Sequence, residues 1–262
     1  MVHQREQGVL LEVAYDGTGF HGWATQKERR TVEDTLRGAV LAMAPDVGEL
    51  RGTSRTDAGV HAEGQAVAFD TSREIPAQGW VLGLNQHLPD DVAVRAARSV
   101  SAGYSPRFCA RTKRYRYRVL VDAVRDPGWH TRAWRVSEID LSSMVVEAEA
   151  ARGTHDFAAF RGSADARATT VRTLTRVDVE READRRVLGI VVEGNAFLYN
   201  MVRILVGTMV DVARGRLRAG AMARAIETRS RADAGATAPA HGLVLEHVDL
   251  VLPEAAGPSW PR

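Results

Sequence analysis

Hydrophobic residues recur at every second position in several short stretches of this chain, a spacing typical of half-buried strands. The first is GVLLEVAYDG (residues 8–17), where Val9, Leu11 and Val13 alternate with less apolar neighbours until an Asp-Gly turn. The same reasoning predicts strands at residues 48–55, 65–70, 92–100, 107–121, 170–180, 187–197 and 238–252. Two of these, TVRTLTRVDVE and VLGIVVEGNAF, are joined by the polar turn READRR, which predicts a hairpin.

Other stretches repeat their hydrophobic residues every three to four positions, which predicts helices. In residues 31–45, Thr31 with Asp34 resembles a capping box, and Pro45 ends the pattern. Further helices are expected at residues 77–85, 141–151, 198–214 and 219–228. Because hairpins dominate, we expect a mixed α+β fold built on antiparallel sheets. Two sheet-plus-helix domains, residues 1–104 and 105–262, should meet near residues 100–110.

Composition describes an ordinary globular protein. The 262 residues can bury a large core, and 45% of them are hydrophobic while 26% are charged. The single cysteine, Cys109, excludes an internal disulfide and a multi-cysteine zinc site and fits a reducing compartment. No long apolar run follows the first charges, and no stretch of about twenty apolar residues could span a membrane. We therefore expect a cytoplasmic protein with no signal peptide and no membrane association.

Net charge is only +2, so a polyanionic partner would have to be met by a local basic patch. The 35 basic residues include just two lysines, Lys27 and Lys113. Arginine binds phosphate and stacks on bases better than lysine does. GC-rich codon usage explains the bulk arginine bias equally well, so the positions of the arginines carry more information than their number.

A short loop raises the first question of chemistry. Residues 55–65 read RTDAGVHAEGQ, with Asp57 two residues after Arg55 and two glycines bracketing His61. Glycines suit a tight loop that holds side chains in a fixed pose. The simplest interpretation of Asp57 is a turn in which its carboxylate bonds its own backbone. A lone loop histidine such as His61 is also more often a hydrogen-bonding residue than a catalyst.

The strand that contains RTKRYRYRV carries tyrosine and arginine on opposite faces. Lys113, Tyr115, Tyr117 and Val119 share one face, while Arg114, Arg116 and Arg118 share the other. This pattern can be an ordinary half-solvated strand with cross-strand pairing. Its functional interpretation is a stacking surface for unpaired bases beside a basic track for phosphates, enlarged by Arg107 and Arg111.

The helix predicted within residues 197–215 is apolar over most of its circumference and should be buried, yet it carries Arg203. A buried arginine requires an anionic partner, and Asp57 is the best candidate. Alternatively, Arg203 extends to solvent or pairs with Glu193 or Asp211. The chain contains no GxSxG motif, no phosphate-binding P-loop, no dinucleotide fingerprint and no metal-ligand spacing.

Six further blocks accompany RTDAGVHA and together resemble the TruA-type tRNA pseudouridine synthases. In order, they are YDGTGFHGW, LNQHLPDDVAV, RFCARTKRYRYRV, HDFAAFR, NAFLYNMVRILVGTM and APAHGLVL. The resemblance covers nearly the whole chain. It implies a fold of two RRM-like halves around a basic cleft. It also implies an isomerase that converts uridine to pseudouridine at positions 38, 39 and 40 of the tRNA anticodon stem-loop. A homodimer that uses no cofactor or metal is implied as well.

The resemblance also implies roles for particular residues. Asp57 would be the nucleophile, Arg203 its ion-pair partner, and Tyr115 would lie against the target uracil and assist proton removal. Arg55 would hold the target nucleotide flipped out of its stack, and His61, Arg114 and Arg116 are further expected substrate contacts. Attack of the carboxylate on the ribose and abstraction of a sugar proton both stay open.

Two positions depart from the family pattern. Ser54 stands where glycine commonly precedes the arginine, and Ala24 stands where glutamine is usual, but neither change removes a catalytic group. Two other functions stay in view: a non-catalytic RNA-binding module, and a pseudouridine synthase that acts on another RNA. Retention of Asp57, Tyr115 and Arg203 together favours an enzyme, because phosphate binding requires no carboxylate.

Overall fold

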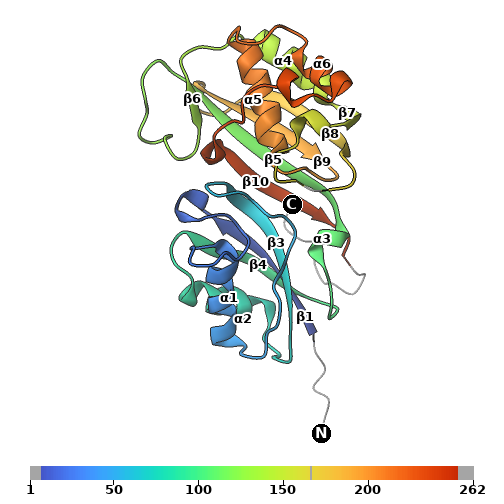
Figure 1. The fold of residues 1–262 in the computed structure, drawn as a ribbon. Helices are drawn as coiled ribbons and strands as arrows, with labels where there is room; N and C mark the ends of the chain where they lie inside the picture. Colours follow the sequence, from blue (N-terminus) through green and yellow to red (C-terminus); the bar gives the residue numbers. More distant parts are fainter. Residues whose placement is uncertain (1–6, 166, 253–262) are drawn as a thin grey trace. The chain divides into compact units, whose positions relative to one another are not determined.

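The computed structural model describes residues 7–165 and 167–252 as a mixed α+β protein whose strands pair mostly antiparallel (Figure 1). Its described residues form two compact units: residues 7–111 with 245–252, and residues 112–244. The domain boundary expected after residue 104 stays a prediction. The last strand, however, was expected in the second domain and most of it belongs to the first unit.

The first unit is built on four main strands and one short strand. They are β1 (Gln7–Tyr15), β2 (Arg51–Gly52), β3 (His61–Thr71), β4 (Val92–Val100) and β10 (Leu243–Leu250). The main strands lie in the order β4-β1-β3-β10, and β2 pairs with β3. β1 is antiparallel to both neighbours, with Val9 opposite Phe69 and Leu11 opposite Ala97. Alternating apolar residues are thereby fixed on one face of this sheet.

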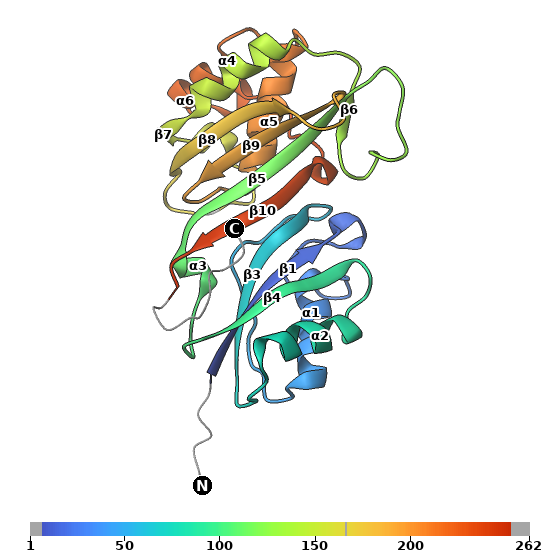
Figure 2. The same cartoon turned by 180° about the vertical axis from the view of Figure 1, so that it is seen from behind.

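Two helices cover one face of these strands, as Figures 1 and 2 show. Helix α1 (Val32–Met43) begins where expected, because the hydroxyl of Thr31 accepts a hydrogen bond from the Asp34 amide. Its buried residues repeat at helical spacing: Val32, Leu36, Ala39 and Val40. Helix α2 (Ala77–His87) buries Trp80, whose ring meets Phe69 of β3 edge-on at 5.3 Å. These contacts form the core on that side of the unit.

The second unit has its own strands, which pair antiparallel except for β6. They are β5 (Ala110–Val121), β6 (Trp134–Val136), β7 (Gly153–Asp156), β8 (Val171–Arg181) and β9 (Val187–Gly194). Their order is β5-β9-β8-β7, and β6 pairs with β5 in parallel. The predicted hairpin is confirmed, since β8 and β9 pair antiparallel across the READRR turn.

Helices α4 (Leu141–Ala151), α5 (Met201–Ala213) and α6 (Ala221–Thr228) lie on one face of these strands (Figure 2). Helix α5 is buried along almost its whole length, which confirms the expectation from its apolar circumference. The predicted strand from residue 107 is wrong at its start, because Pro106–Cys109 form a short helix, α3. Proline at the first turn has no amide to lose, so it favours this helical start.

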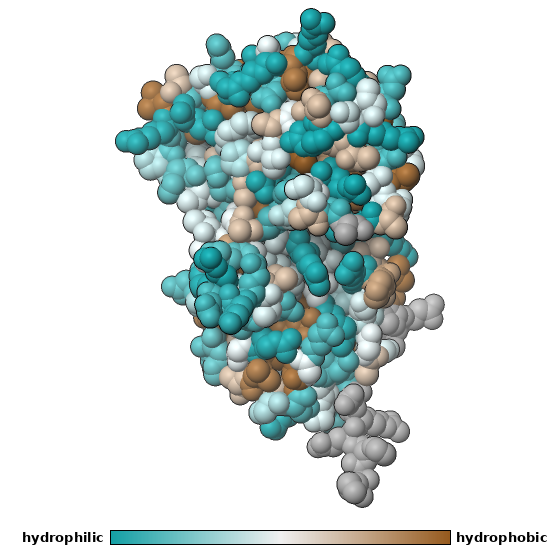
Figure 3. All heavy atoms as spheres, in the orientation of Figure 1, coloured by the Kyte–Doolittle hydropathy of each residue, from teal (hydrophilic) through white to brown (hydrophobic). Residues whose placement is uncertain are grey.

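Short elements complete the chain. Single turns of 3-10 helix occur at η1 (Gly17–Gly19), η2 (Ala158–Phe160), η3 (Arg231–Asp233) and η4 (Ala240–Gly242). In the view of Figure 3, hydrophobic residues are scattered among hydrophilic ones. No helix within the described ranges has both the length and the apolar character needed to cross a bilayer.

Candidate functional site

The RTDAG loop lies in the first unit between β2 and β3. Its residues differ in exposure: Thr56 is buried, Asp57 is half-buried and Arg55 is exposed. The amide of Val60 donates to the carbonyl of Asp57 at 3.1 Å, which closes a turn directly after the aspartate. Arg55 is therefore accessible to solvent and Asp57 partly so, while the buried Thr56 between them anchors the loop.

Gln65 of β3 holds the start of this loop. Its side-chain amide donates to the carbonyl of Ser54 at 2.5 Å, and its side-chain oxygen accepts from the amide of Ser54 at 3.2 Å. Gln65 is fully buried, so both backbone groups of Ser54 are satisfied by one side chain away from water. This pair of hydrogen bonds sets the path of the chain just before Arg55.

A second set of contacts comes from the YDGTGFHGW segment. The Tyr15 hydroxyl lies 2.7 Å from the Thr56 hydroxyl in a buried hydrogen bond. The amide of Trp23 donates to the Thr56 carbonyl at 3.0 Å. Gly22 has φ +96°, and a Cβ at this position would lie 2.8 Å from the same carbonyl oxygen. Glycine is required there, because both the backbone angle and the close approach exclude a side chain.

His61 supports the same loop from its other end. The residue is only 5% exposed, and its Nδ1 accepts from the Gly17 amide at 3.1 Å while lying 3.2 Å from Oδ1 of Asp16. A Cβ on Gly17 would meet the Val60 carbonyl oxygen at 2.1 Å. These contacts agree with the hydrogen-bonding interpretation of His61, and its role as a substrate contact stays a prediction.

In the second unit, Tyr115 lies on β5 opposite Val192 of β9 and is 8% exposed. Its ring meets Phe197 edge-on, with 5.0 Å between ring centroids. Phe197 belongs to the NAFLYN segment between β9 and α5, so the two sequence blocks are joined here. The ring of Tyr115 is thus held in one orientation by an aromatic neighbour.

Arg203 extends from the first turn of α5 and is only half-buried. Its Nε donates to the Ala238 carbonyl at 2.7 Å, and one terminal nitrogen donates to Oδ1 of Asn200 at 2.9 Å. These two acceptors are neutral. The alternative partners considered from the sequence are engaged elsewhere: Glu193 pairs with Arg114 at 2.8 Å, and Asp211 accepts from the Ala236 amide.

Asn200 forms the turn directly before α5 and contacts Arg203. It precedes α5 with φ 61°, a left-handed conformation that is uncommon outside glycine. Asparagine tolerates this conformation better than most residues do. Because its side chain also bonds Arg203, the turn and the guanidinium are positioned together.

The arginine face of β5 is paired with acids. Arg114 pairs with Glu193, directly opposite on β9, and Arg116 pairs with Glu180 at 2.6 Å and Glu182 at 3.0 Å. Arg118 also approaches Glu182, at 3.6 Å. These pairs fit the cross-strand interpretation and neutralise much of the expected basic track. The roles of Arg114 and Arg116 in substrate binding stay predictions.

The next tyrosine of β5, Tyr117, is buried and hydrogen-bonded. Burial raises the pKa of Tyr117, with a smaller opposing effect from the charge of Arg203. Its hydroxyl donates to the Pro239 carbonyl at 2.7 Å. Tyr117 therefore anchors the APAHG segment, and the role of Tyr115 in proton removal stays a prediction.

The predicted residues are divided between the two units. Arg55, Asp57 and His61 share one loop region of the first unit, while Tyr115 and Arg203 lie in the second. Asp57 and Arg203 belong to different units, and their ion pair stays a prediction. Sequence reasoning missed Gln65 and Tyr15. Gln65 is the polar residue directly before the apolar run Ala66–Phe69 of β3, and this position was its only signal.

Metal ligands are not grouped within residues 7–165 and 167–252, where no set of three or more His, Cys, Asp or Glu side chains could hold an ion. Besides His61, the predicted residues are a carboxylate and a guanidinium in the first unit, and a tyrosine with several guanidinium groups in the second. This set suits acid-base or nucleophilic chemistry on a substrate that brings negative charge.

Comparison with known proteins adds independent information. A family model described as tRNA pseudouridine synthase matches residues 12–108 and 148–249, which include most of both units. The chain is 42% identical to the tRNA pseudouridine synthase A of Acetivibrio thermocellus over 243 residues, covering 92% of this chain and 99% of that protein. It is 41% identical to the same enzyme of Pelobacter propionicus over 241 residues, covering 92% of this chain and 98% of the relative.

Proposed function

Because the chain belongs to the tRNA pseudouridine synthase family, we propose that it modifies the anticodon stem-loop of tRNA, at positions 38, 39 and 40. The protein is an isomerase that converts uridine to pseudouridine in tRNA. The observation that carries the site assignment is the RTDAG loop, where Gln65 holds Ser54, directly before Arg55, and Tyr15 and Gly22 contact Thr56, directly before Asp57.

The reaction breaks the bond between ribose C1′ and uracil N1 and forms a new bond from C1′ to C5. Uracil loses the proton on C5 and gains one on N1, so substrate and product are isomers. Asp57 acts as the carboxylate that initiates cleavage. Arg203 opposite it favours the ionised carboxylate, because a guanidinium stabilises a nearby negative charge. Tyr115 lies against the uracil and assists removal of the C5 proton.

The target base must leave its stack before the glycosidic bond is accessible. Flipping a base costs a few kcal/mol, which contacts with exposed arginine and aromatic groups can offset. Arg55 is exposed at the open side of the loop and supplies this contact. Water must be excluded from the cleaved intermediate, since hydrolysis would release the base instead of rejoining it. Thr56 and Val60 are buried residues close to Asp57 in the chain, and they support the exclusion of water.

The proposed enzyme works as a cytoplasmic homodimer, uses no cofactor and requires no metal. Family membership supports the dimer, and the absence of a redox step in the isomerisation supports the lack of a cofactor. Light scattering on the purified protein tests the dimer. A monomeric mass at working concentration would contradict it.

The decisive experiment compares wild type with Asp57→Asn on an unmodified tRNA that carries uridine at positions 38 to 40. Pseudouridine is mapped by nucleotide, and tRNA binding is measured for both proteins. We expect product from wild type at those positions and a loss of at least about 1,000-fold for the variant, with binding retained. Asp90→Asn is the matched control, because Asp90 is an exposed aspartate of the same unit that makes no charged contact with any described residue.

Other outcomes discriminate among the remaining functions. Binding without product in wild type would indicate an RNA-binding module. Product at other tRNA positions, or in another RNA, would refute the anticodon stem-loop proposal while leaving the isomerase. Equal rates for Asp57→Asn and Asp90→Asn would remove Asp57 from the chemistry.

A further inference from the structure

The second unit contains a cavity away from the residues assigned to catalysis. It has a volume of about 230 Å³ and lies among the loop that joins β5 to β6, strand β6 and η4. Six of its lining side chains are aromatic or cationic: Arg125, Trp129, His130, Trp134, Arg135 and His241. None of these residues has a role in the proposed chemistry.

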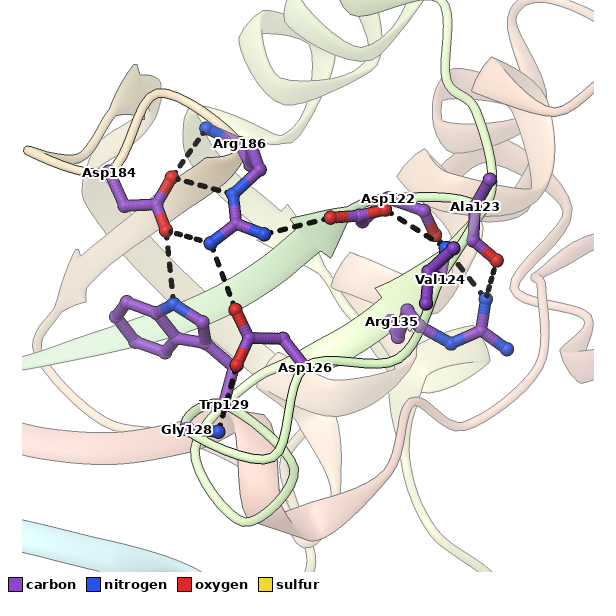
Figure 4. Close-up of polar contacts among 9 residues, drawn as sticks. All are labelled: Asp122, Ala123, Val124, Asp126, Gly128, Trp129, Arg135, Asp184 and Arg186. Atoms are coloured by element: carbon purple, nitrogen blue, oxygen red, sulfur yellow. Dashed lines mark hydrogen bonds and ion pairs between the residues drawn. The ribbon is translucent and has the colours of Figure 1, made fainter.

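One guanidinium holds the loop that forms this cavity. Arg186, in the turn between β8 and β9, lies 2.8 Å from Asp122, 2.9 Å from Asp126 and 2.8 Å from Asp184 (Figure 4). The indole nitrogen of Trp129 donates to the same Asp184 carboxylate at 3.2 Å. The loop is therefore fixed to the hairpin before any ligand binds, which lowers the entropic cost of binding.

Both tryptophan rings of the cavity also pack against other side chains of the second unit. Trp129 packs on a buried cluster of Leu120, Ala133 and Val187. Trp134 meets Tyr117 edge-on, with 6.4 Å between ring centroids. Both residues are partly exposed, and each indole packs on one or more buried side chains. Rigid aromatic rings of this kind are effective stacking surfaces for a planar group.

Charge in the cavity is predominantly positive. Arg125 is exposed and forms no ion pair with any described residue. Arg135 uses one terminal nitrogen for the carbonyls of Asp122 and Ala123, at 3.3 and 3.1 Å. The one acid of the lining, Asp126, is already occupied by Arg186 and the Gly128 amide. A ligand therefore meets guanidinium groups without a competing free carboxylate.

The volume limits the ligand to a small planar group. Sites for drug-sized molecules are about 300–1,000 Å³, and this cavity is smaller. Stacking rings beside arginine are the combination that binds a base together with its phosphate. We propose that the cavity is a subsite for one unpaired nucleotide of the tRNA substrate, with its base against Trp129 and Trp134 and its phosphate on Arg125. The subsite rests on the proposed function, because that function supplies the tRNA.

Steady-state kinetics with intact tRNA test the phosphate contact. The double variant Arg125→Ala/His130→Ala should raise KM about tenfold and leave kcat unchanged, since both side chains are exposed lining residues. Arg218→Ala is the control, because Arg218 is another exposed arginine of this unit with no charged partner among the described residues. Equal, small effects of Arg125→Ala/His130→Ala and Arg218→Ala would overturn the phosphate contact.

Photocrosslinking tests the base contact without any substitution. Wild-type protein is irradiated with tRNA that contains 5-bromouridine, and crosslinked peptides are mapped. We expect crosslinks at Trp129, His130 or Trp134, from an unpaired nucleotide other than the modified uridine. Crosslinks confined to other peptides would overturn the proposal.

Two controls separate the possible failures. If wild type forms pseudouridine in this tRNA while both tests fail, the subsite is wrong and the function stands. If wild type forms none, the function itself has failed. A change in oligomeric mass for Arg125→Ala/His130→Ala, with KM unchanged, would assign the cavity to a contact between two copies of the chain and would also refute the nucleotide subsite.

Discussion

Two loops of this protein are held rigid by opposite means. The RTDAG loop of the first unit is fixed by buried, uncharged hydrogen bonds from Gln65 and Tyr15. The loop between β5 and β6 in the second unit is fixed by Arg186 and three carboxylates near the surface (Figure 4). Each arrangement ties a functional segment to a neighbouring strand or hairpin, yet the two differ in their energetics.

Burial explains the difference. A buried backbone group that loses its partner costs about 1–3 kcal/mol, because water cannot replace the lost hydrogen bond. Ion pairs at the surface contribute much less and are screened by salt. The RTDAG loop should therefore be sensitive to single substitutions and insensitive to salt. The Arg186 cluster should show the reverse, since water can solvate each of its members.

The largest effect is expected for Gln65→Leu. This change leaves the amide and carbonyl of Ser54 buried without their partner, so the free energy of unfolding should fall by about 2–4 kcal/mol. Because the loop carrying Asp57 shifts, kcat should fall about 10- to 100-fold. Chemical denaturation and steady-state kinetics measure the two effects.

Asn85→Leu is the matched control for Gln65→Leu. Asn85 of α2 holds the amide and carbonyl of Val94 in the same bidentate manner, at 2.9 and 2.8 Å, but contacts no residue of the RTDAG loop. Its loss should lower stability by about 1–2 kcal/mol and leave kcat unchanged. If both variants lost kcat in proportion to stability, the positioning role of Gln65 would be refuted.

A smaller effect is expected for the bond between Tyr15 and Thr56. Tyr15→Phe should lower the free energy of unfolding by about 1 kcal/mol. The double variant Tyr15→Phe/Thr56→Val should be little less stable than Tyr15→Phe alone, because the hydrogen bond is already lost. The coupling is read from a double-mutant cycle by denaturation in low and high salt. Strict additivity of the two substitutions would show that the hydroxyl pair does not stabilise the loop.

Arg186→Gln should lower the thermal midpoint less than either change in the RTDAG loop. The deficit relative to wild type should shrink in about 1 M salt, where charge interactions extend only about 3 Å. Gln65→Leu should keep its full deficit under the same conditions. A salt-independent loss for Arg186→Gln would contradict the surface character of this cluster.

The smallest effect concerns pH. Hydrogen bonds from the Arg186 side chain hold the pKa of Asp184 at about 2, below its usual value of 3.8. A lowered pKa in the folded state stabilises the fold fully above pH 3.8, and this contribution is lost as pH falls toward 2. The difference in thermal midpoint between wild type and Asp184→Asn should therefore be constant above pH 3.8 and vanish near pH 2. A difference that grew on acidification would have the wrong sign for this linkage.

Local patterns predicted most of the secondary structure. The stripe of α1, its Thr31 cap, the buried circumference of α5 and the β8–β9 hairpin all follow from neighbours within a few positions. The short strands β6 and β7 were not predicted, because three or four residues are too few to display a period. Residues 107–109 were wrongly predicted as strand, because the alternation of the following residues was extended back into the short helix Pro106–Cys109.

The sequence by itself determined the fold class, the family and the identity of the candidate catalytic groups, because these depend on residue types and on order along the chain. Only the tertiary structure decided how those groups are held. Tyr15 meets Thr56 across 41 positions, and Arg186 meets Asp122 across 64. Such contacts leave no local periodicity in the sequence, because each residue fits the pattern of its own strand or turn. The two partners meet only once the chain has folded.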